Sequence, residues 1–282
     1  MRRPYQNPSK FDLFKGSRIN LFIAVNVAVF LVINVVGFLF NKTSVFNDWL
    51  EINLSMPSDL PALAFKFWTP FTYMFTHADF WHIFFNMIWL FWIGSILEDF
   101  LNKKQITFIY IAGGLAGGIL FLLAFNLFPA FREMKGSSIL LGASGSVTAI
   151  VLAAAVLLPE YGIMLFGVLE LRLKYLALIF VAMDVLGIVK NPGGSFAHIG
   201  GALLGFIYIR QLQSGNDWSR LFQKQRKLKV VSRGNPGGAT IPDQEVIDRI
   251  LDKISRSGIE SLSKQEKEQL SNLSKSNETK ER

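Results

Sequence analysis

Residues 136–159 read GSSILLGASGSVTAIVLAAAVLLP, a run of 24 residues without a charged side chain. A helix needs about 20 apolar residues to cross roughly 30 Å of hydrocarbon, so this stretch predicts a membrane span. Other runs with no charge, or with a single charge, are read as further spans: 19–40, 80–97, 106–131, 175–189 and 191–209. The sequence therefore predicts an all-α polytopic membrane protein with six transmembrane helices.

The composition agrees with a membrane protein. Of 282 residues, 51% are hydrophobic and 18% are charged, and 26 are Phe. This excludes a disordered, collagen-like or coiled-coil chain and is too apolar for a typical soluble enzyme. The chain has no Cys, which excludes disulfides, thiol nucleophiles and Cys-ligated metal sites.

The net charge of +8 lies mainly at the two ends of the chain. Cytoplasmic flanks of membrane proteins are rich in Lys and Arg, so we expect both termini in the cytoplasm and no nucleic-acid partner. The expected organisation is a basic cytoplasmic flank, a transmembrane domain, a basic juxtamembrane segment with a linker, and a small helical cytoplasmic tail: 1–18, 19–212, 213–242 and 243–282.

Two segments outside the spans carry structural signals. The first outer loop, 41–76, is amphipathic and contains Trp49 and Trp68. We expect it to lie partly in the membrane interface, although an ordinary folded loop fits the same pattern.

The sequence of the tail predicts a helical hairpin that turns near Gly258, with Asp243 and Ser263 as helix caps. A module of about 40 residues is too small to be stable alone, so we expect it to dock on a partner that the sequence does not identify.

Each of the three His residues, His77, His82 and His198, lies in or beside an apolar run. Ionisable groups at membrane depth are costly and mark functional sites, although a His can also simply join two helices by hydrogen bonds. His82 and Asn86 are four residues apart and so share one helix face. Two neutral donors there suit the stabilisation of an oxyanion, or else form a polar clamp between helices.

Ser144 lies between Gly142 and Gly145, so its hydroxyl is approachable and another helix can come close. Alone, such small residues are ordinary packing positions in membrane helices. The pattern also differs from the soluble hydrolase elbow, because Ser146 stands where that motif needs glycine.

Gly201 and Gly205 are four residues apart and give the helix of His198 a surface for close packing. If this helix packs on the helix of Ser144, a neutral imidazole can take the hydroxyl proton as the oxygen attacks a carbonyl.

Together, H-x-x-x-N at 82–86, G-x-S-G at 142–145 and A-H-x-x-G at 197–201 resemble the rhomboid intramembrane serine proteases, over roughly residues 19–212. The resemblance implies an enzyme without cofactor or metal that cleaves transmembrane protein substrates in the lipid bilayer. Ser144 would be the nucleophile and His198 the general base, with no acidic third member. The Ser144 N–H, His82 and Asn86 would hold the oxyanion in a cavity open to the outer face. The second and fifth spans would form a lateral gate, and the layout implies a bacterial inner (cell) membrane.

Some positions depart from the family pattern or stay open. Many members have Trp-Arg in the first outer loop, whereas this chain has Trp68-Thr69, which puts the tethering of the loop in doubt. His77 either faces the cavity as an accessory residue or is a structural histidine at the interface. Asp184 can hydrogen-bond across the bundle or lie at the water boundary, and the sequence gives it no catalytic role.

Other functions compete with proteolysis. The sequence has no H-E-x-x-H zinc motif, and Asp184 is the only aspartate well inside a span, which disfavours metallo- and aspartyl proteases. A rhomboid-like protein without activity, which binds or escorts transmembrane helices, is the main alternative. A small transporter or channel is another, but it would need more charged residues within the spans.

Overall fold

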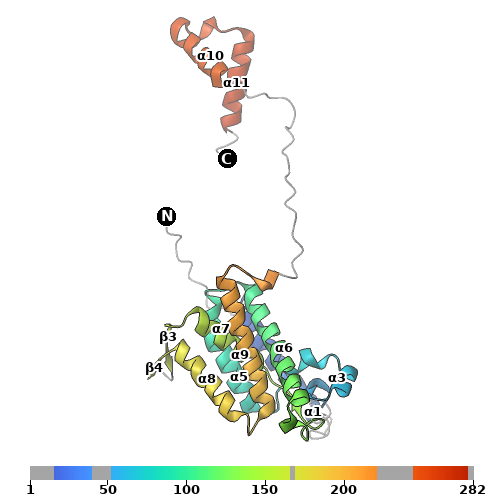
Figure 1. The fold of residues 1–282 in the computed structure, drawn as a ribbon. Helices are drawn as coiled ribbons and strands as arrows, with labels where there is room; N and C mark the ends of the chain where they lie inside the picture. Colours follow the sequence, from blue (N-terminus) through green and yellow to red (C-terminus); the bar gives the residue numbers. More distant parts are fainter. Residues whose placement is uncertain (1–15, 40–51, 166–168, 221–243, 279–282) are drawn as a thin grey trace. The chain divides into compact units, whose positions relative to one another are not determined.

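The computed structural model describes residues 16–39, 52–165, 169–220 and 244–278. They fall into two compact units that divide between residues 223 and 224, and each is described by itself (Figure 1). Parts of several predictions lie outside the described residues: most of the basic N-terminal flank, Trp49 in the first outer loop, the linker, and the Asp243 cap.

The described part of the first unit is built from six helices of 14 to 25 residues, which confirms an all-α fold. They are α1 (Arg18–Leu39), α5 (Phe80–Glu98), α6 (Lys103–Leu127), α7 (Ser144–Leu157), α8 (Leu173–Gly187) and α9 (Pro192–Gln213). Three of these, α1, α5 and α6, are long and apolar enough to cross a membrane. That all six cross it stays a prediction.

Helix α7 begins later than the apolar run 136–159 suggests. Residues Ile139–Leu140 form strand β2, which pairs antiparallel with β1 (Met56–Pro57). Gly142 then has a φ of +114°, a left-handed conformation that residues with a side chain rarely adopt. Strand and turn therefore occupy the start of the run, and the helix begins only at Ser144.

Between α1 and α5 the chain forms short elements: α3 (Leu60–Phe65), α4 (Thr69–Thr72) and a 3-10 turn, Tyr73–Phe75. Phe65 and Phe67 are 83% and 74% exposed. That this loop lies partly in the membrane interface stays a prediction. The Trp68 indole N–H donates to the Asn53 carbonyl at 2.8 Å. This contact tethers the loop although the arginine of the family pattern is missing.

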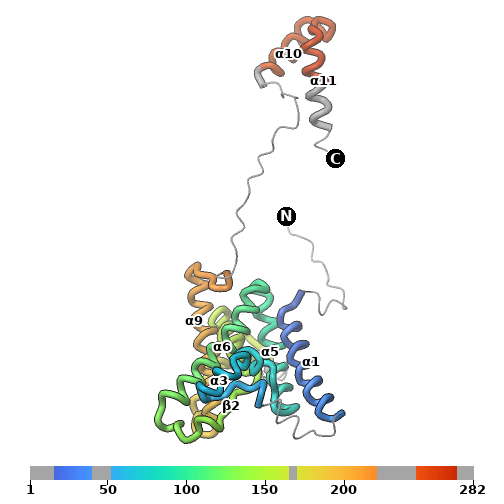
Figure 2. The backbone as a smooth tube through the Cα atoms, turned by 90° about the vertical axis from the view of Figure 1, so that its right-hand side faces the viewer, coloured from blue at the N-terminus to red at the C-terminus, as the bar shows by residue number. Residues whose placement is uncertain are grey.

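Helices α6, α7 and α9 pack side by side (Figure 1). At several of their glycines the backbones come so close that no side chain fits. A methyl group at Gly201 would lie 2.0 Å from the Gly145 carbonyl oxygen, and one at Gly117 would lie 2.6 Å from the Ala197 oxygen. Helix α8 packs against α7 and α9, and it follows the hairpin of β3 (Gly162–Leu165) and β4 (Leu169–Arg172). Helix α1 lies at the edge of the bundle beside α5 (Figure 2).

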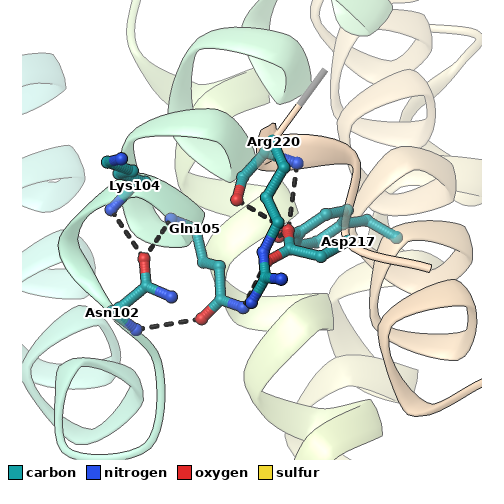
Figure 3. A network of polar contacts seen from close by, with 7 residues as sticks. Asn102, Lys104, Gln105, Asp217 and Arg220 are labelled. Atoms are coloured by element: carbon teal, nitrogen blue, oxygen red, sulfur yellow. Dashed lines mark hydrogen bonds and ion pairs between the residues drawn. The ribbon is translucent and has the colours of Figure 1, made fainter. Parts of the chain in front are cut away.

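A polar network joins the start of α6 to the end of α9 (Figure 3). Asn102 and Gln105 form a capping box that begins α6. The Gln105 side-chain amide donates to Asp217 at 3.1 Å, and Asp217 also accepts from Arg220 and from the Tyr208 hydroxyl. Burial raises the pKa of Asp217, but its hydrogen bonds, first those from Ser219, outweigh burial and hold the pKa below its usual value. This carboxylate therefore fixes the two helix ends to each other.

The second unit contains α10 (Gln244–Ser257), a 3-10 turn (Ile259–Ser261) and α11 (Lys264–Glu278). Gly258, with a φ of +76°, follows the end of α10. The Ser263 N–H donates to Glu266 at 2.7 Å, and the Glu266 N–H donates to the Ser263 hydroxyl at 3.3 Å. The tail is thus helical as expected, while its docking partner stays a prediction.

Candidate active site

A cavity of about 570 Å³ lies among α5, α7, α8 and α9. Four predicted site residues line it, and they come from three helices far apart in the sequence: His82 and Asn86 on α5, Ser144 on α7, and His198 on α9. The structure therefore brings the three sequence motifs to one place. What each residue does there stays a prediction.

Ser144 is the first residue of α7, directly after the Gly142 turn. The first N–H groups of a helix have no partner within the helix and carry its partial positive charge. Among the described contacts, no hydrogen bond engages the Ser144 N–H or hydroxyl. A hydroxyl and an unpaired backbone N–H thus lie together at the cavity wall.

His82 lies against the turn that precedes Ser144. A methyl group on Gly142 would lie 2.6 Å from His82 Nε2 and 3.7 Å from Ser144 Oγ. Asp79 caps α5 by accepting the His82 backbone N–H at 2.9 Å, which fixes the helix turn that carries the ring. The imidazole therefore fits only because residue 142 has no side chain.

Asn86 lies one turn further along α5 and is 7% exposed. One hydrogen of its amide nitrogen is donated to the His82 carbonyl at 2.8 Å. Because a carboxamide has two such hydrogens, the second is free for a ligand in the cavity.

In the part of the chain that the structure describes, the His198 side chain is hydrogen-bonded to a residue of α8, Asp184, and not to a residue of α7. Its Nδ1 lies 2.6 Å from Asp184 Oδ1, and both side chains line the cavity. Of the two expectations for Asp184, the hydrogen bond across the bundle is the one observed. In this part of the structure no hydrogen bond joins Ser144 to His198. Catalytic hydrogen bonds often become short and well aligned only when substrate binds.

His77 does not line the cavity but supports its wall. It is 5% exposed, its Nε2 accepts the Ala143 N–H at 3.4 Å, and its ring meets His82 edge-on with centroids 5.1 Å apart. Burial, and secondly the neighbouring His82, lower the pKa of His77 from 6.5 to about 3. His77 therefore stays neutral at physiological pH and contacts the turn before Ser144.

The glycines around the site let the backbones approach. Gly145 and Gly201 meet at the contact of α7 with α9. A methyl group at Gly205 would lie 2.3 Å from the Ala149 carbonyl oxygen, one turn further along both helices. These contacts set the separation between Ser144 and His198.

The fold and the cavity define a polytopic membrane protein with a serine and a histidine facing a shared internal cavity. Residues 64–214, more than half of the chain, match the model of the rhomboid domain. The chain belongs to the rhomboid family. Residues 241–276 match a family of unknown function, DUF6576.

Similar proteins occur in mitochondria and in bacteria. The RHOMBOID-like protein 12, mitochondrial, of Arabidopsis thaliana is 30% identical over 61% of this chain and 54% of its own length. The presenilin-associated rhomboid-like protein A, mitochondrial, of Danio rerio is 30% identical over 58% of this chain and 43% of its own. The rhomboid protease GlpG of Salmonella choleraesuis is 34% identical over 23% of each chain.

This chain thus spans about half the length of the first two relatives. Membership of the rhomboid family supports an integral membrane protein. Because two of these three are mitochondrial, they do not favour a bacterial membrane, and that compartment stays a prediction.

Proposed function

We propose that the protein is an intramembrane serine endopeptidase that hydrolyses peptide bonds in or near transmembrane helices of other membrane proteins. The observation that carries the proposal is the cavity that Ser144 and His198 share with His82 and Asn86. A nucleophile, a base and two neutral donors around one space are the parts that acyl transfer requires.

In the proposed reaction the Ser144 oxygen attacks the carbonyl carbon of the scissile bond while His198 Nε2 takes the hydroxyl proton. The electron pair of the C=O bond moves to oxygen. As the C–N bond breaks, the same proton passes from His198 to the leaving amine. Water then attacks the acyl-enzyme, with His198 again acting as base, and regenerates Ser144.

The negative oxygen of the tetrahedral intermediate needs donors that are already oriented. The free N–H of Ser144 points from the positive end of α7, and the His82 ring lies beside the same turn. The second amide hydrogen of Asn86 is the third donor. Removal of one such preoriented donor from a serine protease costs about 2.7–4 kcal/mol of transition-state stabilisation.

Substrate would enter between α5 and α8, the second and fifth long helices. Trp89 on α5 and Phe180 on α8 meet edge-on there, with ring centroids 5.0 Å apart, and both line the cavity. A carbonyl within an intact helix is hydrogen-bonded and inaccessible to attack. We therefore expect substrates whose transmembrane helix unwinds readily at the cleavage site.

The test compares wild type with Ser144→Ala, both purified in detergent and reconstituted in liposomes, on a single-span substrate whose helix is destabilised. Ser146→Ala is the matched control, because Ser146 Oγ is buried without a hydrogen-bond partner and lies outside the cavity. We expect Ser144→Ala to lower cleavage by about 1000-fold or more and to abolish labelling by a fluorophosphonate. Ser146→Ala should keep both.

Cleavage by Ser144→Ala at the wild-type rate would contradict the proposal. If wild type neither cleaves nor reacts with the fluorophosphonate, the protein is instead a rhomboid-like binder of transmembrane helices. Labelling of Ser144 without cleavage would support the enzyme and show that the substrate was wrong.

A further inference from the structure

The contact between His198 and Asp184 assigns a role to the aspartate. Asp184 Oδ1 lies 2.6 Å from His198 Nδ1, and the side chains are 13% and 26% exposed. The other titratable residues that line this cavity are Asp79 and His82, and no Lys or Arg lines it. In the described structure, His198 is thus the only recorded ion-pair partner of Asp184.

We infer that Asp184 is a positioning residue that orients His198 and selects its tautomer, a role that rests on the proposed function. The Asp184 carboxylate accepts a hydrogen bond from an N–H at Nδ1, so the neutral imidazole carries its hydrogen on Nδ1. The lone pair is then on Nε2, which is the nitrogen that must take the proton of Ser144. Without the carboxylate the ring can place its hydrogen on either nitrogen and can rotate away.

The contact has a second consequence during the reaction. When Nε2 takes the proton of Ser144, the imidazole becomes a cation. Of the two carboxylates that line the cavity, Asp79 and Asp184, the recorded contact with His198 is that of Asp184. Asp184 stabilises this cation while the Nδ1 hydrogen stays on Nδ1 and the carboxylate stays unprotonated. The serine–histidine pair of the proposed mechanism thus has an acidic partner, contributed by the helix that borders the entrance.

The kinetic test uses Asp184→Asn, with Asp184→Glu as the conservative variant and Asp217→Asn as the matched control. Asp217 is also an almost buried hydrogen-bonded carboxylate, but it lies in the network between α6 and α9 and not at the cavity. We expect Asp184→Asn to lower kcat by about 100-fold or more, with KM nearly unchanged, and to slow fluorophosphonate labelling equally. Asp184→Glu should recover part of the loss, and Asp217→Asn should lower the unfolding temperature but keep kcat.

A second measurement does not need activity. The chain has three His residues, so a spectrum of protein with ¹⁵N-labelled histidine contains few signals, and the variant His198→Gln assigns that of His198. We expect the neutral Nδ1–H form in wild type and a mixture of the two tautomers in Asp184→Asn.

The possible failures are distinguishable. If wild type shows Ser144-dependent cleavage and Asp184→Asn keeps its kcat, the role of Asp184 is wrong and the proposed function stands. If wild type is inactive and unreactive, the proposed function fails, and the tautomer of His198 still decides whether Asp184 orients the ring. An Nε2–H form in wild type would overturn the inference.

Discussion

At the scale of the residue, the wall behind Ser144 depends on neutral groups in tight contact. Gly142 leaves room for the His82 ring, and buried His77 accepts the N–H of Ala143. A charge on His77 would replace this acceptor with a donor, and among the described residues no carboxylate forms an ion pair with His77. The conformation of the turn therefore depends on His77 remaining neutral.

This leads to a pH prediction. The folded chain holds His77 neutral down to about pH 3, whereas the unfolded chain protonates it below its ordinary pKa of 6.5. As pH falls below 6.5, the unfolded state takes up a proton that the folded state does not, so stability decreases by about 1.4 kcal/mol per pH unit. The effect is absent above that value and ends near the folded pKa.

The measurement is thermal unfolding in detergent from neutral pH down to about pH 4, for wild type and His77→Gln. We expect a shallower loss of stability in the variant, whatever its stability at neutral pH, because Gln does not titrate. Equal slopes would show that His77 is not the group responsible.

At the scale of the element, the contact of α9 with α7 sets the separation of the two reactive side chains. Gly201→Ala places a methyl group 2.0 Å from the Gly145 oxygen, which forces the helices apart. We expect it to lower stability by about 1–3 kcal/mol and to reduce fluorophosphonate labelling of Ser144. Gly193→Ala is the matched control, because its methyl group on the same helix would meet Phe121 at 3.4 Å, an ordinary contact. Equal labelling in the two variants would mean that the separation of α7 and α9 does not control the site.

The positions of the helices were largely predictable from sequence, because long apolar runs have few alternatives at membrane depth. Each predicted span overlaps one of the six long helices. The start of α7 was not predictable from hydropathy: residues 136–143 are as uncharged as the helix, and the turn at Gly142 is a property of the backbone.

The candidate site shows the same division. Ser144, His198, His82 and Asn86 could be selected from motif spacing, and the structure brings them to one cavity. The role inferred for Asp184 could not be predicted from motif spacing. Its contact with His198 joins two helices, and the sequence does not specify how these helices are rotated relative to each other. The available signal was that an aspartate well inside a span is costly and calls for a function.

At the scale of the whole molecule, the six predicted spans are an even number and would place both termini on one side of the membrane. We propose that this side is the cytoplasm or its equivalent, because Lys and Arg gather at both ends of the chain. The Cys-free sequence allows a direct test with single cysteines and a membrane-impermeant maleimide on intact cells that express the chain.

The sites are Ser9→Cys in the N-terminal flank, Ser257→Cys at the end of α10, and Ser137→Cys before β2; Ser137 and Ser257 are exposed in the structure. We expect only Ser137→Cys to react from outside, and the other two to react after the membrane is opened. Reaction of Ser9→Cys and Ser257→Cys from opposite sides would mean an odd number of spans.

Helix α8 carries both Phe180, at the contact with α5, and Asp184, at His198. The two residues are four positions apart, so they lie one above the other on the same helix face. If substrates enter between α5 and α8 by displacing α8, the same displacement withdraws the Asp184 carboxylate from the His198 imidazole. Entry of the substrate segment and cleavage of its peptide bond then occur one after the other, because cleavage needs Asp184 back at His198. A substrate segment that keeps α8 displaced is not cleaved and can leave intact. The time that α8 takes to return would therefore contribute to substrate selectivity.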